Sequence, residues 1–425
     1  TRRRHEPAMP RRLPLSLLLL LALALPATLF AADDWNQFRG PGGDGKSNAK
    51  NVPVRFGEGK NIAWKTKIHG KGWSSPVVWG KQIWMQTATK DGHEMFAVCV
   101  DAETGRIVHD IKVFHVKKPR FCIEANSYAS PTPFVEKGRV YVHFGSYGTA
   151  CLDAKTGKTI WERRDLKCNH FRGPASSPIV HGDRLYVHFD GSDFQYVVAL
   201  DKTTGKTVWK TDRNIDYGTD NGDRKKAYAT PAIITVNGKE QLIAPSAVET
   251  IAYDVETGKE LWKVRHGGMN AAARPVFGHG LVYISAGSGR RQLIAVKPTG
   301  QGDVSDTHIV WQTGRGAPKR SSQILRGDLF FMINDKGVAT CLDARTGKRH
   351  WTKRIGGDYW ASPVLVGNRI YCFSKKGRIP VFKASKTFEK LADNQLGDGF
   401  NASPAFVDDA MILRSFSHLY RVERK

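Results

Sequence analysis

The chain has 425 residues, of which 65 are Lys or Arg and 40 are Asp or Glu, so its formal net charge is +25 at pH 7. Hydrophobic residues make up 40% of the sequence and Gly occurs 42 times, which excludes a disordered chain and favours one large repetitive domain or several ordinary ones. The basic excess favours contact with acidic partners, such as phosphates, anionic lipids or acidic glycans, without choosing among them.

The N-terminal stretch has the order of a secretory signal peptide. Met9 is followed by two Arg residues, then by an apolar run over residues 13–25, and then by the small-residue sequence PATLFAADDW. We therefore predict that residues 1–31 hold a cleaved signal peptide with a few upstream residues. The mature protein would then be exported and soluble, in the periplasm or outside the cell. A membrane anchor is the alternative, although Ser16 and Pro26 leave a short uninterrupted apolar core.

Residues 32–60 are predicted to be an extended segment, and residues 61–425 a single domain of repeats. One phrase recurs eight times, at intervals of about 40–55 residues. Most copies have a Pro near the start, followed by a turn with Gly or Asp and by an alternating apolar run, which is typical of a β-hairpin. The copies begin at Ser74, Ser130, Ser177, Thr230, Arg274, Ser321, Ser362 and Ser403.

A second phrase follows several of these hairpins and is clearest as CLDAKTGKTIWERR from Cys151. The Asp-x-x-Thr-Gly portion predicts a tight turn, because Asp can accept hydrogen bonds from turn amides and Gly can adopt the left-handed conformation. The Trp of the next strand buries a large flat surface. Since the Asp residues occupy equivalent turns of different repeats, we expect them to shape turns and not to form a carboxylate cluster. The residues of this structural repeat are Asp101, Asp153, Gly157, Trp161, Asp201, Gly205, Trp209, Asp254, Gly258, Trp262, Asp343, Gly347 and Trp351.

Four short antiparallel strands per repeat are the unit of a β-propeller blade. The last repeat, from Ser403, ends before a fourth strand, whereas NIAWKTKI from Asn61 is a Trp-bearing strand without a repeat of its own. Joining the two protects sheet edges that would otherwise be exposed. We therefore predict an all-β, eight-bladed propeller whose last blade is closed by the N-terminal strand, with seven blades as the alternative.

The cysteines divide into two groups. Cys99, Cys151 and Cys341 stand at equivalent places in the repeat, and Cys372 lies in the alternating stretch NRIYCFS; all four are predicted to pack in the interior. Cys122 and Cys168 lie in polar connections and are candidates for a disulfide between neighbouring repeats of an exported protein. No CxxC pair is present, so neither a zinc site nor a redox motif is expected.

The Asp-x-x-Thr-Gly-Lys-x-x-Trp repeats and the DWNQFRGPGGDG stretch resemble the pyrroloquinoline-quinone-like (PQQ-like) propeller repeats over about residues 34–425. That family includes quinoprotein alcohol and glucose dehydrogenases, the outer-membrane assembly factor BamB and exported proteins resembling BamB. The resemblance implies that a dehydrogenase would place a vicinal disulfide against the quinone, oxygen ligands on calcium and an Asp as base. This sequence has no adjacent Cys pair and no CxxCH haem motif.

We therefore expect a non-catalytic binding or assembly scaffold of the cell envelope, with no cofactor and no metal. A PQQ- and calcium-dependent dehydrogenase is the alternative, and a carbohydrate-binding propeller is a further one. The expected partner is an envelope protein or a glycan, acidic in view of the charge. A nucleic-acid partner is not expected, and the propeller is expected to be monomeric.

The binding residues are sought where the repeats differ, in the connections that lead into the Ser-Pro strands. These connections are predicted to emerge on one face beside the central channel, and loops on a rigid scaffold commonly carry binding residues. They mix aromatic, cationic and amide side chains, which suit a sugar, a peptide or an anionic ligand. The candidates are Glu124, Asn126, Tyr128, His170, Arg172, Lys225, Lys226, Tyr228, Asn270, Lys319, Arg320, Asp358, Trp360 and Asn401.

Overall fold

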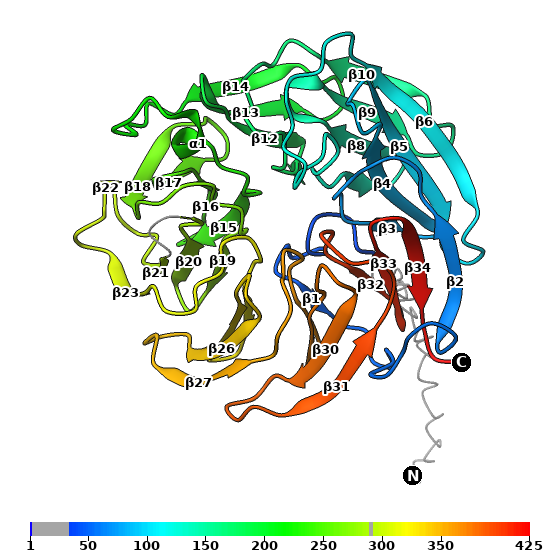
Figure 1. Cartoon of the computed structure of the whole chain (residues 1–425). Coiled ribbons are helices and arrows are strands. Elements are labelled where there is room, and N and C mark those ends of the chain that lie inside the picture. Colours follow the sequence, from blue (N-terminus) through cyan, green and yellow to red (C-terminus); the bar gives the residue numbers. More distant parts are fainter. Residues whose placement is uncertain (2–33, 289–291) are drawn as a thin grey trace. The chain divides into compact units, whose positions relative to one another are not determined.

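Eight antiparallel sheets are arranged around a central axis in the computed structural model, which describes residue 1, residues 34–288 and residues 292–425 (Figure 1). Each sheet has four antiparallel strands, and two of the sheets gain a short fifth strand. The predicted eight-bladed β-propeller is confirmed, and the seven-bladed alternative is wrong.

Blades 1 to 4 carry their strands in the order of the chain, from the axis outward. Blade 1 consists of β3 (Val77–Trp79), β4 (Gln82–Ala88), β5 (Glu94–Asp101) and β6 (Ile107–His115). Blade 2 consists of β7 (Phe134–Glu136), β8 (Arg139–His143), β9 (Thr149–Asp153) and β10 (Thr159–Arg163), with the 3-10 turn η1 (Gly145–Tyr147). Blade 3 consists of β11 (Ile179–His181), β12 (Arg184–Asp190), β13 (Gln195–Asp201) and β14 (Thr207–Asp212), followed by the short helix α1 (Gly222–Lys225). Blade 4 consists of β15 (Ala232–Val236), β16 (Lys239–Pro245), β17 (Glu249–Asp254) and β18 (Glu260–Arg265).

Blades 5 to 7 follow the same order, and blade 8 completes the ring. Blade 5 consists of β19 (Val276–Gly278), β20 (Leu281–Ser285), β21 (Leu293–Val296) and β23 (Ile309–Thr313). Blade 6 consists of β24 (Ile324–Arg326), β25 (Leu329–Ile333), β26 (Val338–Asp343) and β27 (Arg349–Arg354). Blade 7 consists of β28 (Val364–Val366), β29 (Arg369–Tyr371), β30 (Arg378–Lys383) and β31 (Lys390–Gln395). Blade 8 consists of β32 (Ala405–Val407), β33 (Ala410–Arg414), β34 (His418–Val422) and β2 (Ile62–Lys67). The extra strands are β22 (Gly302–Asp303), parallel to β18, and β1 (Lys46–Ser47), parallel to β28.

The ring closes by pairing the two ends of the propeller. Strand β2 is antiparallel to β34, with Ile62 opposite Val422 and Lys67 opposite His418. The indole of Trp64 also donates to the carbonyl of Ala102 in blade 1, at 3.0 Å. The N-terminal strand therefore supplies the fourth strand of blade 8, as predicted.

The repeated Asp-x-x-Thr-Gly-Lys-x-x-Trp phrase shapes one blade and attaches it to its neighbour. In blade 2, Asp153 Oδ1 accepts hydrogen bonds from the backbone N–H and the hydroxyl of Thr156, both at 2.7 Å. The indole of Trp161 then crosses to blade 3, where it donates to the carbonyl of Lys202 at 3.0 Å and lies against Gly205. The same Asp–Thr turn occurs at Asp101, Asp201, Asp254 and Asp343.

Aromatic and aliphatic side chains fill the space between adjacent blades. One such cluster joins Tyr141 and Trp161 of blade 2 to Leu185 and Val187 of blade 3. Cys99, Cys151 and Cys341 are buried in these inter-blade layers. The core is thus distributed around the ring, which leaves the axis free for polar groups.

The predicted signal peptide lies outside the described residues. The propeller forms a unit over Ala32–Lys425. Within the part of the chain that the structure describes, no helix has the length and apolar character needed to cross a membrane.

Candidate functional site: a cavity on the propeller axis

A ring of hydroxyl groups surrounds the axis just before the innermost strands. The backbone N–H of Thr132 donates to Ser177 Oγ at 2.9 Å, and the N–H of Ser177 donates to Thr230 Oγ1 at 3.1 Å, so that each blade is tied to the next. This pattern explains the Ser-Pro repeat, in which the hydroxyl residue stands before the first strand. The accepting residues are Ser75, Thr132, Ser177, Thr230, Ser322, Ser362 and Ser403.

Blade 5 breaks the ring, because Arg274 stands where the other blades have a hydroxyl. The Arg274 side chain is buried, and its Nη1 donates to Gln37 Oε1 at 3.2 Å and to the carbonyl of Phe38 at 2.8 Å. Burial lowers the pKa of Arg274 to about 10, so the side chain stays charged at neutral pH. Arg274, which replaces the hydroxyl residue of the other blades, therefore binds the N-terminal segment.

The N-terminal segment crosses the propeller at the innermost strands. Trp35 forms a β-bridge with Val78 of blade 1, and the carbonyl of Asn36 accepts from the N–H of Val135 in blade 2. The buried Arg39 donates through Nη2 to the carbonyl of Gln323 in blade 6, at 2.6 Å. Strand β1 then joins blade 7. Residues 35–47 thus contact inner strands on both sides of the ring.

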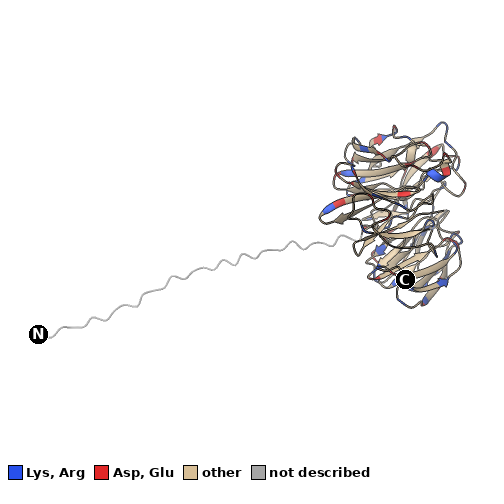
Figure 2. Ribbon diagram, turned by 90° about the vertical axis from the view of Figure 1, so that its left-hand side faces the viewer, with Lys and Arg blue, Asp and Glu red and all other residues tan. Residues whose placement is uncertain are grey.

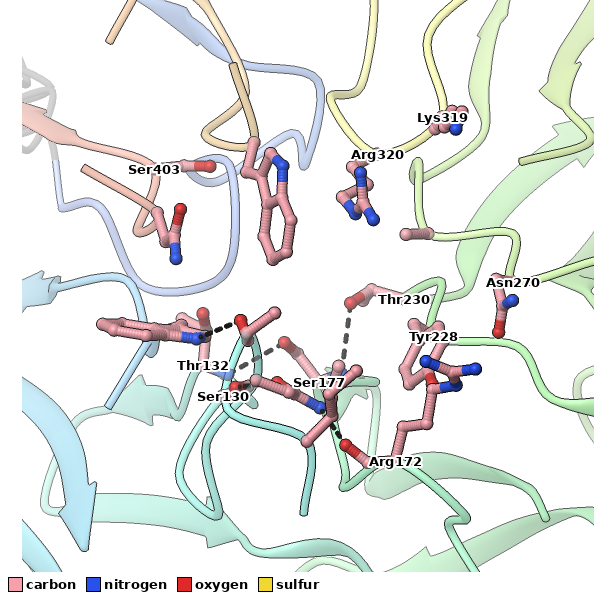
Figure 3. A pocket seen from close by; sticks show the side chains of 18 of the residues that line it. Ser130, Thr132, Arg172, Ser177, Tyr228, Thr230, Asn270, Lys319, Arg320 and Ser403 are labelled. Atoms are coloured by element: carbon pink, nitrogen blue, oxygen red, sulfur yellow. Dashed lines mark hydrogen bonds between the residues drawn. The ribbon is translucent and has the colours of Figure 1, made fainter. Parts of the chain in front are cut away.

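A cavity of about 460 Å³ lies on the axis, and Phe38 of the N-terminal segment belongs to its lining. Its wall contains hydroxyl residues of the ring, and its mouth contains side chains from the connections between blades (Figure 3). The hydroxyl residues are Ser75, Thr132, Ser177, Thr230 and Ser403. The side chains at the mouth include Trp73, Asn126, Arg172, Asp223, Tyr228, Asn270, Lys319, Arg320, Trp360 and Asn401.

Eight of the fourteen candidate residues line this cavity, and the other six lie elsewhere. The eight are Asn126, Arg172, Tyr228, Asn270, Lys319, Arg320, Trp360 and Asn401. Glu124 and Tyr128 line a neighbouring cavity of about 340 Å³, to which Asn126 also contributes. Lys225 pairs with Asp220 at 3.4 Å, and Asp358 pairs with Lys375 at 3.4 Å.

His170 and Lys226, two of the candidate binding residues, are buried and line neither cavity. His170 Nε2 accepts from the backbone N–H of Ser146 at 2.9 Å, and burial holds the pKa of His170 well below its usual range. Lys226 lies over the ring of Tyr228, with its ammonium 4.6 Å from the ring centre, and donates to the carbonyl of Ala227 at 2.5 Å. Burial also lowers the pKa of Lys226. Both side chains thus make their contacts inside the protein, with neighbouring loop residues.

Cys122 and Cys168, the candidates for a disulfide, have different surroundings in the structure. Both are free. Cys168 Sγ lies 3.5 Å from Ser146 Oγ and 3.6 Å from His170 Nδ1. Cys122 instead donates to the carbonyl of Arg172, at 3.6 Å.

Sequence reasoning missed four kinds of lining residue. Trp73 stands directly before the first Ser-Pro copy, and its aromatic character could have marked it. Asp223 is carried by α1 and was overlooked in the polar loop of blade 3. The ring hydroxyls were treated as hairpin markers. Phe38 gives no local signal, since the N-terminal segment brings it to the axis from outside the repeats.

Three basic side chains line the mouth of the cavity. Arg172 forms a two-bond ion pair with Asp223, at 2.7 and 2.9 Å. Arg320 pairs with Asp335 at 2.5 Å and stacks on Trp360, with 3.9 Å from its guanidinium carbon to the ring centre. Lys319 completes the set. Elsewhere basic and acidic residues are interspersed around the propeller (Figure 2).

The residues present do not fit the quinone and calcium pair that the resemblance to dehydrogenases would imply. Calcium needs several oxygen ligands, carboxylates above all. Asp223 is the one carboxylate among the described residues that line the cavity, and both of its oxygens accept from Arg172. No group of three or more His, Cys, Asp or Glu suited to a metal is found in the described ranges. The adjacent Cys pair is also missing from the sequence.

Comparison with known families agrees with the repeat pattern. A family model described as the outer membrane protein assembly factor BamB matches residues 60–212 and 193–425. The chain belongs to this family. Its members have PQQ-like propeller repeats, so the fold and the family predicted from the sequence are both confirmed.

Individual relatives include enzymes and a BamB protein. Tetrathionate hydrolase of Acidithiobacillus ferrooxidans is 25% identical over 277 residues, which are 59% of this chain and 51% of the hydrolase. The chain therefore matches about half the length of that relative. BamB of Moraxella catarrhalis is 12% identical, with a TM-score of 0.58, over 85% of this chain and 99% of BamB. Quinohemoprotein alcohol dehydrogenase ADHIIG of Pseudomonas putida is 12% identical, with a TM-score of 0.66, over 92% of this chain and 80% of the dehydrogenase. These two structural likenesses show the fold alone.

Proposed function

We propose that this protein is a non-catalytic binding scaffold of the cell envelope, whose axial cavity holds an acidic segment of a partner protein. The observation that carries the proposal is the composition of the cavity mouth. Arg172 pairs with Asp223 and Arg320 pairs with Asp335, whereas the Lys319 side chain forms no ion pair within the described residues. A partner that brings negative charge would complete this arrangement, because charge complementarity selects and orients a partner at an interface.

The rest of the lining supports binding and not catalysis. Aromatic and amide side chains beside the cations, such as Tyr228 and Asn270, provide apolar contact and hydrogen bonds with fixed direction. The cavity falls within the range of about 300–1,000 Å³ that is usual for ligand sites. Membership in the family of an assembly factor favours the same class of function, and an exported location would follow from the predicted signal peptide.

Two other functions are alternatives to the binding scaffold. A carbohydrate-binding propeller is supported by the same aromatic and amide groups, and an acidic glycan would meet the same cations. A quinoprotein dehydrogenase is favoured by similarity to such enzymes, but the cavity lacks the carboxylates that would hold calcium beside the quinone.

The test is capture of partners from envelope extracts with the purified propeller and its Lys319→Glu variant. Reversing the charge at the mouth should weaken capture of an acidic partner by about tenfold or more, since close charge pairs at interfaces commonly contribute over 1.4 kcal/mol. Lys348→Glu is the matched control, because it makes the same charge change in an exposed turn of the same blade, away from the cavity.

The outcomes separate the candidates. Protease treatment that removes the captured material supports a protein partner, whereas loss of the material only with glycan-degrading enzymes supports the carbohydrate alternative. Equal capture of acidic material by the parent and the Lys319→Glu variant would contradict the cavity as the binding site.

A further inference from the structure

The hydroxyl ring has hydrogens that its own bonds leave unused. Each ring hydroxyl accepts a hydrogen bond from the backbone N–H of the preceding blade, as between Thr132 N and Ser177 Oγ. A Ser or Thr hydroxyl has one hydrogen to donate in addition to its acceptor sites. Within the described residues, none of the seven ring hydroxyls donates a hydrogen bond to another protein group. Seven donors therefore remain around one axis.

Five of these seven hydroxyls belong to the cavity lining, and they come from consecutive blades. They are Ser403, Ser75, Thr132, Ser177 and Thr230, from blades 8, 1, 2, 3 and 4. All five residues are at least 95% buried. Ser322 and Ser362 do not line the cavity; near them Arg39 donates to the carbonyls of Gln323 and Pro363. These five residues are the hydroxyl arc, and Figure 3 labels four of them, Thr132, Ser177, Thr230 and Ser403.

Buried donors without acceptors are costly, and a ligand atom with negative charge satisfies them best. A hydrogen bond to an ionised acceptor is shorter and roughly twice as strong as one between neutral groups. Acceptors of this kind are absent from the described wall near the arc, because Asp223 at the mouth is already bound by Arg172. The three cations of the mouth would add long-range attraction for the same charge.

We propose that the hydroxyl arc is the seat of an oxyanion, in which a carboxylate, sulfate or phosphate group of the ligand accepts hydrogen bonds from the ring hydroxyls on the propeller axis. This inference rests on the proposed function and names the group by which the ligand is anchored. Phe38 also lines the cavity, and Arg172, Lys319 and Arg320 would bind the charge from the mouth side. The ring that ties the blades together also serves as the recognition element.

The probes are inorganic sulfate, inorganic phosphate and D-glucuronate, each titrated into the full chain by calorimetry at constant ionic strength. The first two are tetrahedral oxyanions and the third presents a planar carboxylate on a sugar, so their relative affinities identify the source of the anchoring group. The expected result is binding of at least one probe with one site per chain. Absence of binding for all three at millimolar concentration would overturn the seat, while leaving the capture experiment to decide the proposed function.

The variants are Ser177→Ala and Thr230→Val, combined in one chain, with Ser362→Ala as the control. Ser362 Oγ accepts the backbone N–H of Ser322 at 3.0 Å, just as Ser177 Oγ accepts that of Thr132 at 2.9 Å, but Ser362 does not line the cavity. Its removal therefore costs a similar structural bond without removing a donor to the ligand. We expect the double variant to bind the oxyanion at least about tenfold more weakly, since a hydrogen bond to a charged group is worth about 1.5–3 kcal/mol. Ser362→Ala should bind as the parent does.

The two proposals fail differently. If the double variant keeps the parent affinity while Lys319→Glu loses it, the hydroxyl seat is wrong and the basic mouth alone holds the ligand. If the double variant and Ser362→Ala lose affinity equally, the hydroxyl groups affect binding only by holding the blades in place. That result would also contradict the oxyanion site at the hydroxyl arc. Thermal unfolding of each variant confirms that the propeller remains folded during the titrations.

Discussion

At the scale of single residues, the repeated Asp-x-x-Thr-Gly-Lys-x-x-Trp sequence connects each blade to its neighbour. Gly205 has a φ of +71° and stands where a Cβ atom would come 2.6 Å from Cε3 of Trp161, the tryptophan of the preceding blade. The glycine is thus required twice, once for the turn and once for the approach of the indole. Gly258 and Gly347 meet Trp209 and Trp311 in the same way.

We predict that Gly205→Ala destabilises the propeller more than Gly182→Ala. Gly182 also has a positive φ, +55°, but no atom lies within 4 Å of the position its Cβ would take, so only the left-handed backbone cost of about 1–2 kcal/mol applies. At Gly205 the collision with Trp161 should add about 1–3 kcal/mol. Chemical denaturation of the two variants measures the difference in the free energy of unfolding. Equal losses would contradict the claim that Gly205 is needed for the contact with Trp161.

At the scale of elements, the N-terminal segment is part of the ring and of the cavity. Arg274 replaces a ring hydroxyl and binds the segment at Gln37 and Phe38, and strand β1 attaches the segment to blade 7. The position of Phe38 in the cavity lining therefore depends on an arginine in blade 5.

We predict that Arg274→Ser releases residues 34–47 although it restores the hydroxyl found in the other seven blades. The buried Gln37 Oε1 and the partly buried carbonyl of Phe38 would lose a charged donor, at a cost of about 1–3 kcal/mol for the buried one and less for the other. Limited proteolysis should cut the variant in this segment faster than the parent. Arg106→Ser, at an exposed turn, is the control. Equal cleavage rates for the parent and Arg274→Ser would show that the arginine does not hold the segment.

At the scale of the whole molecule, the blade count and the closure could be predicted because they are repeated in the sequence. Eight hairpin phrases and an unmatched Trp-bearing strand at Asn61 leave few ways to complete a ring. The mouth of the cavity was predicted in part, since Arg172, Arg320 and Trp360 lie in connections that differ between blades. Burial was not visible locally, and Lys226 therefore seemed as exposed as Lys225. Phe38 and Arg274 could not be assigned, because their contact joins positions more than two hundred residues apart.

The same scale decides between a scaffold and an enzyme. The most direct measurement is to add quinone and calcium to the purified protein and to follow the cofactor absorbance together with dye-linked oxidation of alcohols. Our account predicts no turnover, because the described cavity lining offers one carboxylate, Asp223, and both of its oxygens already accept from Arg172. Stoichiometric binding of the quinone with calcium-dependent turnover would contradict the scaffold function.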